Sequence, residues 1–223
     1  MSTMKIDSYE EIKDRLRVRL MDMRTHEEDL QRAVYEPVGC GFALVVYMEL
    51  PDEIAEGGIA NVPKVAAAAL GVDERTLVQD AMENSVENMA PKLSTMRSTL
   101  FGPPENLFTE DECGEEKDFL VLTNMDGRLG ASVLYYPDIT SRISEIVDGD
   151  YFVLPSSIHE VLILPDHGQI PAKDLLMMVK EVNEAEVLPE EQLGNKVLHF
   201  RADLQMLQVA AELTRDRNRG EER

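Results

Sequence analysis

The apolar positions near the start of the chain recur at three- and four-residue steps. They follow Ser8, which has the capping-box spacing Ser-x-x-Glu with Glu11, and charged residues fill most positions between them. One apolar face with a solvated remainder is typical of an amphipathic helix. The pattern predicts one long or bent helix over residues 9–33, with an apolar face formed by Ile12, Leu16, Leu20 and Met23.

The next apolar segments are shorter and are separated by glycine and proline. Residues 42–48 are an uninterrupted apolar run, which predicts a buried strand. Pro63 is suited to the first turn of a helix that ends before Gly71. Asp73 is suited to cap a second helix, which Pro91 should bend or stop.

The C-terminal half has a different pattern of apolar residues, in which short apolar runs alternate with segments of helical periodicity. The predicted strands are 119–123, 131–136, 151–154, 161–164 and 197–200, and the predicted helices are 138–147, 172–185 and 203–216. Turn residues at 124–127 and 155–158 favour hairpins and antiparallel pairing. We therefore expect an α+β fold: a mostly antiparallel sheet of five or six strands, helices chiefly on one face, and the long N-terminal helix.

Residues 101–118 differ from both halves, because they contain two adjacent prolines and seven carboxylates against one lysine. This composition predicts a linker or mobile loop. It would join a helical lobe with one strand, residues 1–100, to an α+β lobe, residues 119–223. One compact domain is the alternative.

Charge and cysteine content narrow the classes of function. With 22 basic and 43 acidic residues the net charge is −21, which opposes binding to phosphate backbones, so we expect no nucleic-acid partner. Only Cys40 and Cys113 occur, too few for a disulfide framework or a four-thiolate zinc site, and no apolar stretch approaches the ~18 residues of a membrane helix. We expect an acidic cytoplasmic protein with no membrane partner.

A segment at residues 65–77 resembles a helix-turn-helix, because a turn glycine separates two helical patterns. The second helix would present Asp73, Glu74 and Asp80 to a polyanion. An ordinary helix–helix corner is the alternative, and regulation of DNA is the third of our functional hypotheses.

The turn at residues 155–160 holds the residue types of a hydrolase site. Ser156 and Ser157 are possible nucleophiles, His159 a possible base and Glu160 a possible acidic partner. There is no G-x-S-x-G sequence, and along a strand Glu160 would point away from Ser157 and His159. The alternative is that these residues only form the turn.

The same region offers candidate metal ligands. His159, Asp166 and His167 could gather at one end of a hairpin, and imidazole and carboxylate suit zinc, iron or manganese. The H-E-x-x-H sequence of metalloproteases is absent. Solvated loop residues are the alternative, and we expect no cofactor and no bound metal.

Four ordered motifs resemble a known family. They are LTN at 122–124, GASVLYYP at 130–137, YFVLPSSIHEV at 151–161 and MVKEVNEAEV at 178–187. Together they resemble an uncharacterised bacterial family, a domain of unknown function from anaerobic, gut-type Gram-positive bacteria. The resemblance implies a cytoplasmic bacterial protein and brings no activity, cofactor or partner.

These observations favour a non-enzymatic binding or interaction module whose partner is a protein or a second copy of the chain in a homo-oligomer. The alternative is a hydrolase or metal-dependent enzyme centred on Ser156, Ser157, His159 and Glu160.

Overall fold

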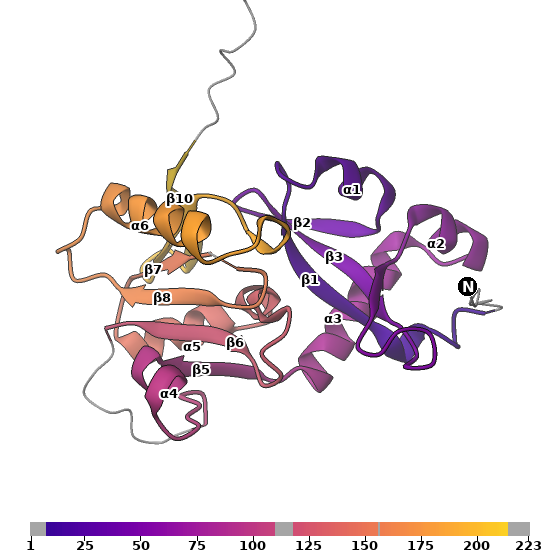
Figure 1. Cartoon of the computed structure of the whole chain (residues 1–223), viewed down its shortest axis with the longest axis horizontal. Helices are drawn as coiled ribbons and strands as arrows, with labels where there is room; N and C mark the ends of the chain where they lie inside the picture. The colour runs from indigo at the N-terminus through magenta and orange to yellow at the C-terminus, as the bar shows by residue number, and fades with distance from the viewer. Residues whose placement is uncertain (1–7, 110–117, 156, 214–223) are drawn as a thin grey trace, which may run out of the picture.

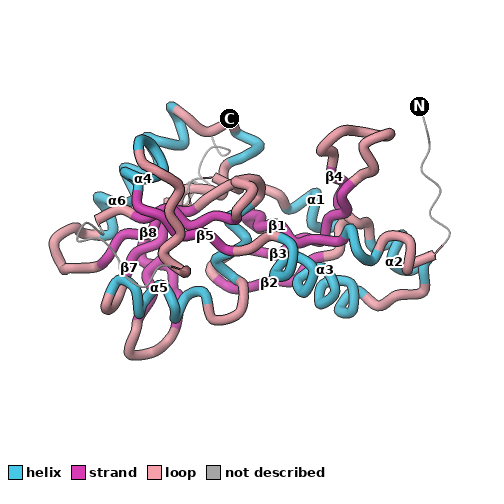
Figure 2. Tube along the Cα trace, turned by 90° about the horizontal axis from the view of Figure 1, so that it is seen from below, coloured by secondary structure: helices cyan, strands magenta, loops and turns pink. Residues whose placement is uncertain are grey.

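The chain folds into two antiparallel sheets that lie side by side (Figures 1 and 2). The computed structural model describes residues 8–109, 118–155 and 157–213. One sheet has four strands and the other has six, and helices pack on both. The predicted α+β class and antiparallel pairing are confirmed, but the described strands form two sheets rather than the one predicted sheet of five or six strands.

The first sheet is built around a fully apolar strand. Its strands are β1 (Leu16–Asp22), β2 (Tyr35–Gly39), β3 (Phe42–Glu49) and β4 (Ile59–Asn61). The central strand β3 pairs with β1 on one edge and with β2 and β4 on the other. The short helices of this half are η1 (Lys13–Arg15), α1 (Glu27–Arg32) and α2 (Lys64–Leu70).

Helix α3 (Glu74–Asn88) lies along β1 and β3 (Figures 1 and 2). It buries Leu77, Val78 and Ala81 against the sheet. Ser85, also buried, accepts a hydrogen bond from the backbone N–H of Val18 at 2.9 Å and donates one to the Ala81 carbonyl at 2.7 Å. The Ser85 hydroxyl of α3 therefore accepts a hydrogen bond from a backbone N–H on the outer edge of β1, the edge that pairs with no strand of the sheet.

The second sheet has the order β10-β9-β7-β8-β6-β5. Its strands are β5 (Pro91–Thr95), β6 (Leu120–Asn124), β7 (Tyr151–Leu154), β8 (Val161–Pro165), β9 (Lys196–Arg201) and β10 (Met206–Glu212). The accompanying helices are α4 (Met96–Phe101), η2 (Gly130–Tyr135), α5 (Ile139–Val147), α6 (Ala172–Ala185) and η3 (Pro189–Glu191). Strand β5, which follows α3 directly, belongs to the second sheet. The division of the chain into two lobes joined at residues 101–118 stays a prediction.

Helices cover both faces of the second sheet, contrary to the prediction that they lie chiefly on one. Phe152 and Leu154 of β7 pack with α6, whereas Tyr151 and Val153 point to the opposite face and join the core that includes α5 and η2. Successive side chains of a strand point to opposite faces, so these fully apolar strands require cover on both. That larger core also contains the inner residues of β1, β3 and α3, so the two sheets share it.

A buried ion pair also connects the sheets. Lys196 of β9 places its Nζ 2.6 Å from Asp22 Oδ2 at the end of β1, and the two side chains are 2 % and 4 % exposed. The same Nζ donates to the Cys40 carbonyl at 3.1 Å and lies 4.2 Å from the ring centroid of Phe42. A second carboxylate, Glu212 Oε1 of β10, lies 3.9 Å from this ammonium group.

The predicted long N-terminal helix is wrong, because residues 16–22 form strand β1. Leu16 and Leu20 are four residues apart, but with Val18 they also alternate with Arg17 and Arg19, and the chain follows this two-residue period. In the sheet, where β1 pairs with the apolar strand β3, every residue of the segment except Arg19 is buried, which an isolated amphipathic helix could not achieve.

Two further predictions in the second half are corrected. Residues 130–135 form the 3₁₀ helix η2 rather than a strand, since both edges of β6 are already occupied by β5 and β8. Residues 206–212 form β10 rather than part of a helix, because the edge of β9 pairs with them. The turn at 124–127 leads into η2, so only the predicted hairpin at 155–158, between β7 and β8, is confirmed.

The other predicted elements are confirmed. These include the strand at 42–48, the helices at 138–147 and 172–185, and the cap on α3, where the Asp73 carboxylate accepts from the Arg75 and Thr76 backbone N–H groups. Of the predicted loop, residues 110–117 lie outside the described residues, whereas Leu107 is buried. Within the described residues no helix is long and apolar enough to cross a membrane.

Candidate functional site

Side-chain contacts with the backbone and with Glu191 define the geometry around Ser157 and His159. Ser157 Oγ accepts a hydrogen bond from the backbone N–H of His159 at 3.0 Å. The His159 ring accepts from the Leu129 backbone N–H at Nδ1, 3.2 Å away, and its Nε2 lies 3.3 Å from Glu191 Oε1. A backbone donor at Nδ1 places the proton of the neutral ring on Nε2, where Glu191 accepts it.

His159 therefore has an observed role in positioning a turn. Leu129, which it holds, has the left-handed φ of 54°, and the His159 carbonyl accepts a further bond from Thr123 Oγ1 at 2.8 Å. Both ring nitrogens have partners other than serine. Ser156 lies outside the described residues, and the catalytic roles suggested for Ser157, His159 and Glu160 stay predictions.

The three predicted metal ligands do not come together. His159 precedes β8, whereas Asp166 and His167 follow it, and the seven residue steps from 159 to 166 span about 23 Å in an extended chain. Across residues 8–109, 118–155 and 157–213, no group of three or more His, Cys, Asp and Glu side chains could hold a metal ion.

Asp166 instead pairs with a histidine that the sequence analysis did not single out. His199 Nε2 of β9 lies 3.0 Å from Asp166 Oδ2 and 4.0 Å from Asp150 Oδ2. Its ring packs on that of Phe152, with centroids 4.6 Å apart. These residues meet because Phe152 is opposite His199 in the β7–β9 register, and that register cannot be read from the sequence of either strand.

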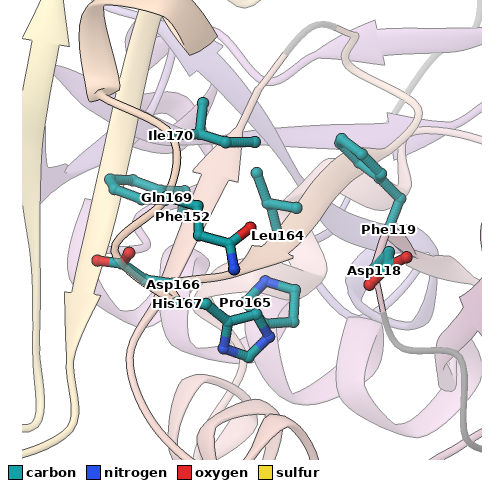
Figure 3. Close-up of a pocket in the computed structure, with 9 residues that line it drawn as sticks. All are labelled: Asp118, Phe119, Phe152, Leu164, Pro165, Asp166, His167, Gln169 and Ile170. Carbon is teal, nitrogen blue, oxygen red and sulfur yellow. The ribbon is translucent and has the colours of Figure 1, made fainter.

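A cavity of about 260 Å³ opens beside this cluster at the end of β8, and we call it the β8 pocket (Figure 3). Its lining residues are Asp118, Phe119, Phe152, Leu164, Pro165, Asp166, His167, Gln169 and Ile170. Figure 3 shows Asp118 and Phe119 on one side and Asp166 on the other. Two of the predicted site residues, Asp166 and His167, thus line a pocket.

The β8 pocket combines an apolar floor with a negative rim. Phe152 and Leu164, which belong to the core beneath α6, supply apolar surface, and Ile170 is 39 % exposed. Asp166 Oδ2 lies 3.0 Å from His199 Nε2, a contact that is an ion pair only when the imidazole is protonated, whereas Asp118 forms no ion pair in the part of the chain that the structure describes. An unpaired carboxylate beside exposed apolar surface suits a ligand with a positive charge and an apolar group.

The segment that resembles a helix-turn-helix forms α2 and α3. The buried face of α3 packs on β1, and Asp73 and Glu74 stand at its N-terminus. The end that would have to enter a DNA groove is therefore acidic, which agrees with the helix–helix corner.

Comparison with known proteins gives one match. A family described as a family of unknown function, DUF5688, matches residues 1–202. The chain belongs to this family. The DUF5688 match extends through β9 and ends before β10. No curated protein and no solved structure matches the chain.

Proposed function

We propose that the chain is a non-enzymatic binding module whose β8 pocket takes a small organic cation with an apolar group. The observation that carries the proposal is the combination of an apolar floor with the carboxylate of Asp118 at the rim, which forms no ion pair with the described residues. The apolar group would cover Phe152 and Leu164, and the cation would offset the charge of Asp118.

The fixed surroundings of His159 support binding over hydrolysis. Its Nδ1 already accepts from the Leu129 backbone N–H, so this nitrogen could act as a base toward Ser157 only after that contact broke. The wider charge of the chain, −21, would also attract a cation over distances up to the screening length of the solution.

Calorimetric titration of three probes of similar shape tests the proposal. The probes are 2-phenylethylamine, which is a cation, 2-phenylethanol, which is neutral, and 3-phenylpropionate, which is an anion. The cation should bind about tenfold more tightly than the alcohol, because only the cation replaces hydration of the Asp118 carboxylate by an opposite charge. The anion should bind least.

Two variants complete the titration. Asp118→Asn should remove the preference for the amine, whereas Asp138→Asn, an exposed aspartate at the start of α5, is the matched control and should preserve it. Equal binding of amine and alcohol, an unchanged preference in Asp118→Asn, or no amine binding at about 1 mM would each contradict the proposal.

The cytoplasmic and bacterial origin, the protein partner and the homo-oligomer stay predictions. We propose them on the acidic composition and on the family resemblance alone.

A further inference from the structure

A second cavity, of about 390 Å³, lies between the two sheets, and we call it the junction pocket. Its walls come from β3, β4 and the loop between these two strands, from Met89 after α3, and from Asp126, Arg128 and Leu129 in the turn after β6. Its volume falls within the range of about 300–1,000 Å³ that is typical of small-molecule sites, which often occur where two structural units meet.

The turn that borders this pocket is fixed by several independent contacts. Leu129 is held in its left-handed conformation by the bond from its N–H to His159 Nδ1. Asn124 Nδ2 donates to the Arg128 carbonyl at 2.7 Å, and a Cβ at Gly130 would lie only 2.2 Å from Thr123 Oγ1. The backbone beneath Arg128 therefore has little freedom to move.

Arg128 reaches across the boundary between the sheets. Its Nη2 donates to the Gly57 carbonyl at 2.9 Å, so one donor of the guanidinium group is used. The fork has five N–H donors, and a carboxylate binds two of them side by side. Arg128 thus brings a positive charge with spare donors to the edge of the pocket.

A buried hydroxyl in the pocket points independently to a ligand. Tyr47 is 2 % exposed, and its hydroxyl contacts only the Met89 sulfur, at 3.7 Å, among the described residues. Sulfur is a weak acceptor, and burial raises the pKa of this hydroxyl, so the hydroxyl stays protonated and could donate a stronger hydrogen bond to an oxygen of a ligand. Both Tyr47 and Met89 line the cavity.

Charges of both signs surround this apolar interior. Glu49 is paired with Arg17 Nη2 at 3.3 Å, which leaves the carboxylates of Asp52 and Asp126 and the guanidinium of Arg128 to face a ligand. A simple anion would be repelled by the two aspartates, and a simple cation would leave the arginine unused.

We propose that the junction pocket binds a free α-amino acid with an apolar side chain. Its carboxylate would pair with Arg128, its ammonium group with Asp52 or Asp126, and its side chain would fill the apolar part beside Met89. The site is separate from the β8 pocket and does not depend on the function proposed there.

Calorimetry with three matched probes tests this proposal. L-leucine carries both charges, L-leucinamide lacks the carboxylate, and 4-methylpentanoate lacks the ammonium group. All are titrated into wild-type protein and into Asp118→Asn, so that binding of the amines at the β8 pocket is recognised. We expect leucine to bind about tenfold more tightly than either analogue in both proteins, since each analogue loses one charged partner.

Variants assign the two ends of the ligand. Arg128→Gln retains an N–H donor for the Gly57 carbonyl but removes the charge, and it should weaken leucine about tenfold while leaving leucinamide unchanged. One of the two variants Asp52→Asn and Asp126→Asn, the one that removes the partner of the ammonium group, should weaken leucine and leucinamide and spare 4-methylpentanoate. Arg32→Gln, at an exposed position in the last turn of α1, is the control and should change nothing.

Three results would overturn the proposal: leucine that does not bind at about 1 mM, an analogue that binds as tightly as leucine, or leucine binding that Arg128→Gln does not weaken in a protein with an unchanged melting temperature. Leucine binding that is lost only in Asp118→Asn would assign the ligand to the β8 pocket and would equally contradict the junction site.

Discussion

Replacing Lys196 by methionine should destabilise the protein more than any surface lysine substitution. Lys196 and Asp22 are 2 % and 4 % exposed, and their charged atoms are 2.6 Å apart, so the substitution leaves a carboxylate buried without its counter-ion. Removing one partner of such a pair costs about 3–5 kcal/mol. Asp22 keeps hydrogen bonds from the Arg24 and Thr25 backbone N–H groups, at 2.9 and 3.0 Å, which favours the lower end, about 3 kcal/mol.

Urea unfolding of four proteins measures this cost and its origin. They are the wild type, Lys196→Met, Asp22→Asn and the double variant. Neutralising Asp22 should destabilise the wild type, because Lys196 then lacks its partner, but it should stabilise Lys196→Met by about 1–2 kcal/mol, because no buried charge remains.

Lys180→Met is the matched control. Lys180 pairs with Glu184 at 3.7 Å on the exposed side of α6, and its loss should cost less than about 0.5 kcal/mol. If Lys196→Met also costs less than about 1 kcal/mol, or if the two substitutions at the buried pair are additive, the ion pair does not hold the sheets together as inferred.

Three further predictions concern buried polar groups. Ser85→Ala should cost about 1–3 kcal/mol in urea unfolding, because a backbone donor of β1 loses its acceptor; a change below about 0.5 kcal/mol would contradict the role given to Ser85. His159→Ala should lower the free energy of unfolding by about 1–2 kcal/mol and increase amide exchange at Leu129, and unchanged exchange there would count against a positioning role. Zinc, manganese and iron should not raise the melting temperature of the wild type, so the substitution should remove no metal-dependent stabilisation. In Cys113→Ser protein, Cys40 should react with iodoacetamide at pH 8 more slowly than a free peptide cysteine, because burial raises the pKa of its thiol and lowers the thiolate fraction; equal or faster alkylation would refute this.

The sequence was sufficient to predict elements whose ends are marked by a capping residue, a glycine or a proline. The cap at Asp73, the glycine at 71 and the apolar run at 42–48 correctly predict α3, α2 and β3. The segments of β1 and β10 were predicted as helices because their apolar residues are three and four positions apart, but the same segments also fit the two-residue alternation of a strand. Their state is decided by free edges on β3 and β9, which lie far away in the sequence.

The candidate site could be predicted only in part for the same reason. Asp166 and His167 stand out because they are titratable residues next to a predicted strand, and both line the β8 pocket. His199 joins Asp166 only through the β7–β9 register, and Asp118 reaches the rim only because β6 pairs with β8. The contact of His159 with the Leu129 backbone could not be predicted, because Leu129 lies on another segment, and the catalytic role of His159 stays a prediction.

A crystal structure of the protein with bound 2-phenylethylamine tests the central proposal most directly. We predict the phenyl ring against Phe152 and Leu164 in the β8 pocket, with the ammonium nitrogen about 3 Å from a carboxylate oxygen of Asp118. An amine bound elsewhere, or one in the pocket with its nitrogen turned away from Asp118, would contradict the proposal.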